Sequence, residues 1–455
     1  MRQTCQLEES ISERVKSWID SQGGVEVGLL VGTASGRDVV IDLLKTPEDE
    51  SGAPASCKDG GRSGKQSGGK SQQEEPDLKL EIDLIVDHAS LVCHMLPGGV
   101  WITGVYLFSP HSSIKPVQQI LCETLKALRK QCPRPECDGD NMHILHASSI
   151  NSKVSMRVSP DATRTPSNLI VYDPKYSSIK PMCSLQCRYH VSVSYPLVGS
   201  PSTRKKIWKE LVEMEAKRLE SAFCVESAGS MKSLDETQPM GKAVELSESD
   251  SENSGVVEVS WVVPMDGGAA DVKEGDVNGK ASLSGVLEAR VYTHEKEQLG
   301  QAVRMLKGDL LSTLRARFKI MEESDLLGAD DLDRTSSIRL PRRVWFPWKC
   351  GISMCDHLTH GESTEAAVQN AAELLSSLQI ASDDIIDTEM YETESSSGGG
   401  SVDWNPSSKE VTEDSTASQK EPSAASTCTP VSLAVSAGAM AVGFFGALIG
   451  WYSRE

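Results

Sequence analysis

Four residues of the types that bind zinc lie within eleven positions of the sequence, and they could form a metal site. They are Cys350, Cys355, His357 and His360. A structural zinc ion takes four cysteine or histidine ligands in a tetrahedral arrangement. The spacing here, Cys-x4-Cys with His-x2-His, differs from that of a standard zinc knuckle. A strand followed by a loop without metal is therefore the alternative interpretation, and no cofactor is predicted.

Two serines in an acidic segment have the spacing that acidophilic kinases recognise. Ser247 and Ser249 each precede an acidic residue by three positions, Asp250 and Glu252. An unmodified, solvated loop is the alternative. Elsewhere, no Ser/His/Asp or Cys/His arrangement has a local signature. The glycine run at 398–400 lacks the strand, helix and lysine of a phosphate-binding loop. The chain is therefore predicted not to be an enzyme.

Hydrophobic periodicity predicts a mixed α+β protein with two domains. The first domain is expected over residues 1–150 and the second over residues 151–385. Predicted strands cover 25–30, 39–44, 78–86, 100–108, 183–195, 287–291 and 343–348; predicted helices cover 7–19, 87–96, 117–129, 207–214 and 299–318. In the second domain a strand followed by a helix occurs twice, which leaves an internal duplication open.

Composition limits what this chain can be. Its formal net charge is -19 and the only compact basic run is 204–206, so nucleic-acid binding is not expected. Segments 48–75, 226–254 and 386–429 are rich in Ser, Gly or acidic residues. They are predicted to be disordered, as an insertion, an acidic loop and a tether respectively. Residues 1–24 contain no apolar signal sequence, so the twelve cysteines are expected to be free thiols in a reducing compartment.

Residues 430–452 are predicted to form a single transmembrane helix. Residues 431–452 contain no charge, and as a helix they would span about 33 Å, the thickness of a bilayer core. The apolar and interfacial residues of this anchor are Val431, Leu433, Val435, Val442, Phe444, Phe445, Leu448, Ile449, Trp451 and Tyr452. Only three residues follow. Insertion is therefore expected after synthesis, with the bulk of the chain in the cytosol.

Residues 104–110, Gly-Val-Tyr-Leu-Phe-Ser-Pro, resemble the strand of metal-dependent deubiquitinase (MPN) domains that carries two zinc-binding histidines. Leu107 and Ser109 occupy the two histidine positions, and Val25 occupies that of the general-base glutamate. Glu26 is one place off and on the opposite strand face. A hydrolytic zinc needs three protein ligands and one open position. The resemblance therefore implies a non-catalytic MPN-like domain that binds a partner, with an isopeptidase of unorthodox site as an alternative.

Several stretches in the same order resemble the odorant response abnormal protein four family of endoplasmic reticulum membrane proteins. They are 28–32 (Gly-Leu-Leu-Val-Gly), 94–100 (His-Met-Leu-Pro-Gly-Gly-Val), 104–106, 340–347 (Leu-Pro-Arg-Arg-Val-Trp-Phe-Pro) and the terminal anchor. The resemblance implies support for the maturation or trafficking of seven-helix, odorant-type receptors. It also implies binding of the ubiquitin-fold-modifier-specific protease at that membrane. The expectation is a tail-anchored adaptor; a chaperone that contacts receptor helices directly through its own anchor is the alternative.

Overall fold

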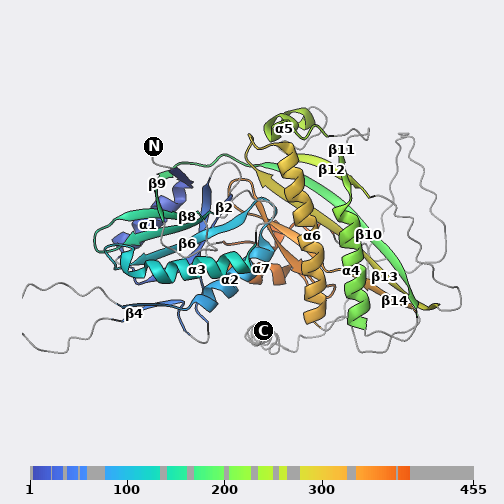
Figure 1. The fold of residues 1–455 in the computed structure, drawn as a ribbon, viewed down its shortest axis with the longest axis horizontal. Coiled ribbons are helices and arrows are strands. Elements are labelled where there is room, and N and C mark those ends of the chain that lie inside the picture. Colours follow the sequence, from blue (N-terminus) through green and yellow to red (C-terminus); the bar gives the residue numbers. More distant parts are fainter. Residues whose placement is uncertain are drawn as a thin grey trace, which may run out of the picture. The chain divides into compact units, whose positions relative to one another are not determined.

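The computed structural model describes residues 4–21, 23–33, 38–49, 52–58, 77–133, 141–160, 169–198, 204–226, 234–248, 256–263, 277–324, 335–375 and 378–389 (Figure 1). All of them belong to one compact unit, Met1–Met390. The second unit, Tyr391–Glu455, lies outside the described residues. The predicted transmembrane helix and nearly all of the predicted tether therefore lie there too. Of the helices that are described, none is long and apolar enough to cross a membrane.

The first part of the compact unit is a closed barrel with the strand order β1-β3-β2-β6-β7-β8-β9. Its strands are β1 (Thr4–Leu7), β2 (Glu26–Thr33), β3 (Val39–Lys45), β6 (Trp101–Ser109), β7 (Met142–Ser148), β8 (Val154–Ser159) and β9 (Ile170–Tyr176). A separate two-stranded sheet pairs β4 (Ala55–Lys58) with β5 (Asp77–Leu80). Because β9 pairs with β1, the sheet closes on itself and leaves no free edge.

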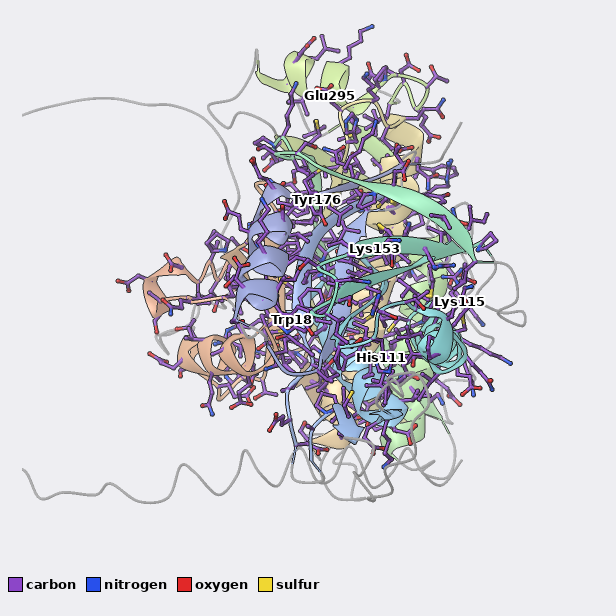
Figure 2. All side chains as sticks on the ribbon, turned by 90° about the vertical axis from the view of Figure 1, so that its left-hand side faces the viewer. Trp18, His111, Lys115, Lys153, Tyr176 and Glu295 are labelled. Carbon is purple, nitrogen blue, oxygen red and sulfur yellow. The ribbon has the colours of Figure 1, made fainter. Side chains whose placement is uncertain are left out.

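Helices cover both faces of the barrel. The helix α1 (Glu9–Asp20) packs on one face and carries Trp18 (Figure 2). The ring of Trp18 lies 5.0 Å from that of Phe108 on β6. The helices α2 (Ile82–Met95) and α3 (Gln118–Gln131) cover the other face, with the short turn η1 (Lys115–Val117) leading into α3 (Figure 1). Successive strand residues point to opposite faces. The strand β6 therefore gives Leu107 to the core under α2 and α3, and Phe108 to the core under α1.

The second part is a sheet of order β11-β12-β10-β13-β14 with helices on one face (Figure 1). The elements are β10 (Cys183–Val198), α4 (Arg204–Glu220), β11 (Phe223–Glu226), α5 (Met240–Glu248), β12 (Val256–Val262), β13 (Val277–Thr293), α6 (Leu299–Glu323) and β14 (Thr335–Arg339). The long strands β10 and β13 pair antiparallel at the centre. Each also pairs in parallel with a later strand, β12 or β14. The strands of the two predicted strand–helix pairs are therefore neighbours in one sheet.

The last part returns to the barrel. It consists of β15 (Arg342–Pro347), β16 (Ser353–Leu358), α7 (Thr364–Leu374) and the turn η3 (Ser382–Asp384). Phe346, Met354 and Leu374 join the core beneath α2 and α3. The core of the first part is therefore completed by residues more than 200 positions further along the chain.

The predicted α+β class is confirmed, whereas the predicted domain boundary at residue 150 is wrong. That boundary falls between β7 and β8, which are neighbours in the barrel. The strands β8 and β9 belong to the first sheet, and β15, β16 and α7 contribute residues to the first core. Barrel closure explains the difference, because pairing of β9 with β1 needs strands from both sides of the predicted boundary.

Three predicted disordered segments contain ordered residues. The insertion 48–75 contains β4, the acidic loop 226–254 contains α5, and residues 386–389 of the tether are ordered. In α5, buried Met240, Ala243 and Val244 form an apolar face too short to stand out in an acidic, Ser-rich stretch. The predicted strand 78–86 is also wrong, because β5 ends at Leu80 and α2 begins at Ile82.

Candidate functional site

The structure shows what occupies the positions that resemble the MPN zinc ligands. Leu107 is fully buried in the core beneath α2 and α3. Ser109 is buried at the end of β6, with its Oγ 3.1 Å from His146 Nε2 and 3.2 Å from His111 Nδ1. Its hydroxyl therefore links two imidazoles within the protein instead of facing solvent.

Sequence reasoning did not identify His111 or His146 as neighbours of Ser109. His111 lies only two residues after Ser109, so its proximity is local and the sequence Ser-Pro-His could have indicated it. His146 comes close because β6 and β7 run parallel, with Leu107 beside His146 and Ser109 beside Ser148. Ser109 and His146 are 37 positions apart, so local spacing does not reveal their contact.

The structure places Val25 and Glu26 on different sides of the barrel wall. The carboxylate of Glu26 accepts hydrogen bonds from Arg14 Nη2 at 2.9 Å and from the Tyr106 hydroxyl at 2.8 Å. Val25 instead lines an open pocket. Glu26 is thus held in an ion pair with Arg14, and the general-base position itself is occupied by the apolar Val25.

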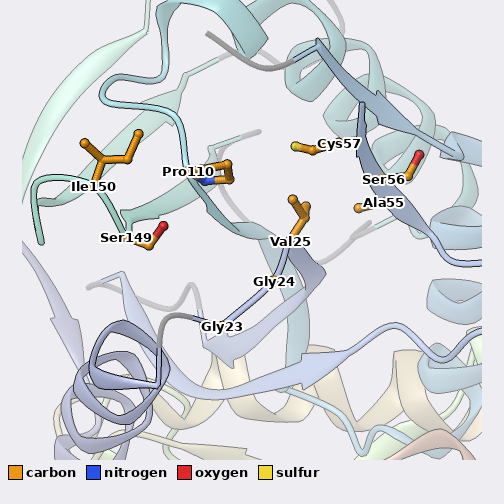
Figure 3. A pocket seen from close by; sticks show the side chains of 9 residues that line it. All are labelled: Gly23, Gly24, Val25, Ala55, Ser56, Cys57, Pro110, Ser149 and Ile150. Atoms are coloured by element: carbon orange, nitrogen blue, oxygen red, sulfur yellow. The ribbon is translucent and has the colours of Figure 1, made fainter. Parts of the chain in front are cut away.

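The pocket beside the end of β6 has a volume of about 710 Å³ (Figure 3). Its lining residues are Gly23, Gly24, Val25, Ala55, Ser56, Cys57, Pro110, Ser149 and Ile150. Figure 3 shows the β4 residues on one side and Ser149 and Ile150, which follow β7, on the other, with Pro110 and the segment before β2 between them. The rim residue Ile150 is 64% exposed, and none of these described lining residues carries a charge.

Hydrogen bonds hold the two loops of the pocket together. The backbone N–H of Ser149 donates to the carbonyl of Ser109 at 3.1 Å, and the Asn151 amide donates to the carbonyl of Ser112 at 2.9 Å. A pre-formed, uncharged pocket with a few hydroxyl and backbone groups suits recognition of an uncharged segment. Among its described lining residues, Cys57 is the one titratable side chain, and no histidine or acidic residue is among them.

The four zinc candidates do not converge. The thiol of Cys355 donates to the carbonyls of His94 and Met95 at 3.6 and 3.4 Å, and His357 Nε2 lies 2.9 Å from Thr313 Oγ1. Cys350 lies in the turn between β15 and β16, and His360 is exposed beyond β16. Burial raises the pKa of the Cys355 thiol to about 11, which disfavours the thiolate that zinc needs. Among the described residues, no group of three or more His, Cys, Asp or Glu side chains could hold a metal ion.

The remaining predicted sites lie partly outside the described residues. The Ser247 hydroxyl, on the last turn of α5, donates to the carbonyls of Val244 and Val256 at 2.9 and 3.1 Å. A kinase would have to break both bonds before it could modify this serine. Ser249 and every predicted anchor residue from Val431 to Tyr452 lie outside the described part of the chain.

Comparison of the sequence with known protein families shows to which family the chain belongs. Residues 28–387 match the family described as Odorant response abnormal 4-like. The chain belongs to this family. The resemblance predicted from the sequence is therefore confirmed, and the matched region includes the barrel strands from β2 onward, the helix-covered sheet and β15.

Relatives of this odorant response abnormal 4-like chain carry the name Protein odr-4 homolog. The protein from Mus musculus is 25% identical over 408 residues, covering 82% of this chain and 83% of that protein. The protein from Homo sapiens is 24% identical over 398 residues, with 82% and 83% covered. The protein from Xenopus tropicalis is 24% identical over 384 residues, with 80% and 81% covered.

A solved structure, described as the crystal structure of UfSP from C. elegans, is similar at a TM-score of 0.42 and 9% identity. The match covers 82% of this chain and 56% of that one, so this chain spans about half the length of that protein. At this TM-score the two folds differ too much for one to be inferred from the other.

Proposed function

We propose that this member of the odorant response abnormal 4-like family is a tail-anchored adaptor of the endoplasmic reticulum membrane. Its MPN-like barrel binds the ubiquitin-fold-modifier-specific protease and holds it at that membrane. In doing so it supports the maturation or trafficking of seven-helix, odorant-type receptors. One observation carries the proposal. Where an MPN enzyme has its catalytic groups, this chain has Val25, which lines the open pocket, and the buried residues Leu107 and Ser109.

The chemistry of the pocket supports binding and not hydrolysis. Ile150, 64% exposed at the rim of the pocket, offers an apolar contact to a bound partner. The predicted tether, as a flexible coil of about forty residues, would have a root-mean-square reach of about 35 Å. A partner bound to the barrel would then be held at a raised effective concentration near the membrane.

The experiment compares two isoleucine substitutions in the full-length, tagged chain expressed in cells. Ile150→Arg places a charge at the rim of the pocket, whereas Ile170→Arg changes an exposed isoleucine on β9. The adaptor proposal expects Ile150→Arg to reduce recovery of the protease by about tenfold or more, because an interface tolerates an unpaired charge poorly. Ile170→Arg should bind normally. Equal recovery with both variants, or no protease with the unchanged chain, would contradict the proposal.

An exchange of residues 431–452 for an unrelated tail anchor tests how the chain acts on receptors. An adaptor needs only to be at the membrane, so receptor delivery to the cell surface should persist. Loss of delivery, with the exchanged protein still at the endoplasmic reticulum, would mean that the anchor itself contacts the receptors. The chain would then be a direct chaperone and not an adaptor.

Isopeptidase activity is tested with purified full-length protein and modifier conjugates. We expect no cleavage. Cleavage that disappears in Ser109→Ala and His146→Ala, two variants of the buried cluster beneath the pocket, would overturn the non-catalytic proposal.

A further inference from the structure

The last described residues of the compact unit form a short strap, residues 386–389, which lies against β15. Ile386 and Trp345 exchange both backbone hydrogen bonds, with N···O distances of 2.9 and 2.7 Å. At the end of the strap, Glu389 is only 1% exposed. A buried carboxylate has to be paired, because an isolated charge in a protein interior is very costly.

The carboxylate of Glu389 binds three elements at once. It accepts hydrogen bonds from Arg317 Nη1 at 2.6 Å and Nη2 at 2.8 Å, on α6. It also accepts the backbone N–H of Arg343 on β15 at 2.7 Å and that of Glu288 on β13 at 2.5 Å. Since Arg317 is itself fully buried, the strap supplies the counter-charge for an arginine of the interior.

A second buried pair continues from the strap to α6. Arg343, whose backbone binds Glu389, directs its guanidinium to Asp309, with Nη1 and Nη2 at 2.7 and 3.1 Å from the two carboxylate oxygens. The same guanidinium lies over the ring of Trp345, 4.3 Å from its centroid. Bidentate pairs of this kind fix the relative orientation of the elements that carry them.

The chain of contacts ends at the Pro-Gly-Gly run between α2 and β6. Gly98 N–H donates to the carbonyl of Arg290, and Gly98 O accepts from Tyr292, both at 3.0 Å. A side chain at Gly98 would meet Asp309, with 3.1 Å between the two Cβ atoms. Gly99 has φ +80 and an added Cβ would lie 2.2 Å from Tyr292 O. Only glycine therefore lets this loop of the barrel reach β13.

We propose that residues 386–389 are a latch that closes the junction between the barrel and the helix-covered sheet. Docking of Glu389 positions Arg343, Arg343 holds Asp309, and Asp309 lies against the loop containing Gly98. Release of the strap opens this junction while each core stays folded. The chain continues from the latch into residues 391–455, so a pull or a cut at that end acts on the junction first. This inference does not depend on the proposed partner.

The test is hydrogen–deuterium exchange of the full chain, comparing Glu389→Gln with the control Glu373→Gln. The first change removes the buried charge and keeps the shape; the second alters an exposed carboxylate on α7. The latch predicts that amides of Trp345, Gly98 and Tyr292 exchange about tenfold faster in Glu389→Gln only, because these bonds open sub-globally. Amides in the centres of β2 and α6 should keep their protection. Uniform acceleration across the unit, or no acceleration at these three amides, would overturn the proposal.

A milder variant keeps the test decisive if Glu389→Gln fails to fold. Asp387 pairs with Arg342 at 2.8 Å, and their side chains are 12% and 13% exposed, so Asp387→Asn weakens the strap at a less buried position than that of Glu389. The latch predicts smaller acceleration at the same amides of Gly98 and Tyr292. Acceleration confined to Arg342 and its neighbours would show that the strap is a local feature and not a latch.

Discussion

The pocket beside β6 and the junction beneath β15 have opposite chemistry. The pocket is open, has a volume of about 710 Å³ and has no charged residue in its described lining. The junction is closed around two arginines, Arg317 and Arg343, each paired with a carboxylate. Buried arginine–carboxylate pairs restrict geometry, whereas uncharged pockets can accept a ligand without a large desolvation cost.

The contrast shows where this chain uses its ionisable groups. An active site concentrates titratable groups in a cleft, where their pKa values are tuned for proton transfer. Among the described residues that line the pocket, Cys57 is the one such group, whereas ion pairs hold α6, β15 and the strap together. The buried ion pairs therefore serve the packing of the junction.

The largest effect is expected from Asp309→Asn, which leaves the buried Arg343 without its counter-charge. The free energy of unfolding of the full chain should fall by about 3–5 kcal/mol, the cost of breaking a buried pair. The control is Glu213→Gln, which removes an exposed partner of Arg315 and should cost about 0–1 kcal/mol. Urea denaturation measures both. If both variants lost less than about 1 kcal/mol, the buried pair would contribute no more to stability than a surface pair.

The second-largest loss of stability is expected from a substitution of Gly99, in the loop that reaches β13. Gly99→Ala introduces a Cβ against Tyr292 O and keeps a left-handed backbone, so unfolding free energy should fall by about 2–4 kcal/mol. Gly361→Ala adds a Cβ with no atom within 4 Å and should change stability by about 0.5 kcal/mol or less. A tolerated Gly99→Ala in thermal denaturation would mean that the loop can leave β13 without consequence.

A buried histidine extends the comparison, because both ring nitrogens of His88 face neutral oxygen atoms. Its Nε2 lies 3.0 Å from Leu374 O and its Nδ1 lies 3.3 Å from Thr46 Oγ1. Burial lowers the pKa of His88 from 6.5 to about 4. The unfolded chain then binds the proton more tightly, so stability present above pH 6.5 is lost as pH falls toward 4.

The size of this loss follows from the pKa difference. At pH 5 it should be about 2 kcal/mol, since each pH unit below 6.5 is worth about 1.4 kcal/mol. His88→Gln, which can still donate to Leu374 O, should show a shallower fall between pH 7 and pH 5. Urea denaturation at both values measures the slope. Parallel slopes in the two proteins would show that His88 does not titrate in this range.

The smallest effect is expected in the pocket. Ile150→Ser removes an apolar side chain that is 64% exposed, so the unfolding free energy should change by no more than about 0.5 kcal/mol. Phe346→Ala, in the core completed by β15, should instead cost about 3–5 kcal/mol. A large loss on Ile150→Ser would mean that the rim of the pocket is part of the fold.

Local patterns predicted the elements whose partners are near in sequence or whose faces are strongly apolar. The hairpin of β2 and β3, the strand β6, and the pairs β10–α4 and β13–α6 all occur where the periodicity placed them. The prediction of a strand over 78–86 was wrong because Ile82 and Leu84 continue the alternating pattern of β5, although they belong to α2. Ile85, Ala89 and Val92, at helical spacing, are the residues that α2 buries.

Long-range contacts could not be predicted. Glu389 stands in an acidic, Ser-rich stretch, and nothing local distinguishes it from the other glutamates there. Its role depends on Arg317, 72 residues earlier. In the candidate site, the resemblance identified Val25, Leu107 and Ser109, whereas the link from Ser109 to His146 follows only from the parallel pairing of β6 with β7.

The most direct test of the account is a hydrogen-exchange footprint of the full-length chain with and without the ubiquitin-fold-modifier-specific protease. The account predicts added protection at the pocket segments 23–25, 55–57 and 149–150, with no change at Trp345 and Gly98 of the junction. Protection at the junction with an unaltered pocket, or no protection anywhere, would contradict the assignment of the pocket as the docking site.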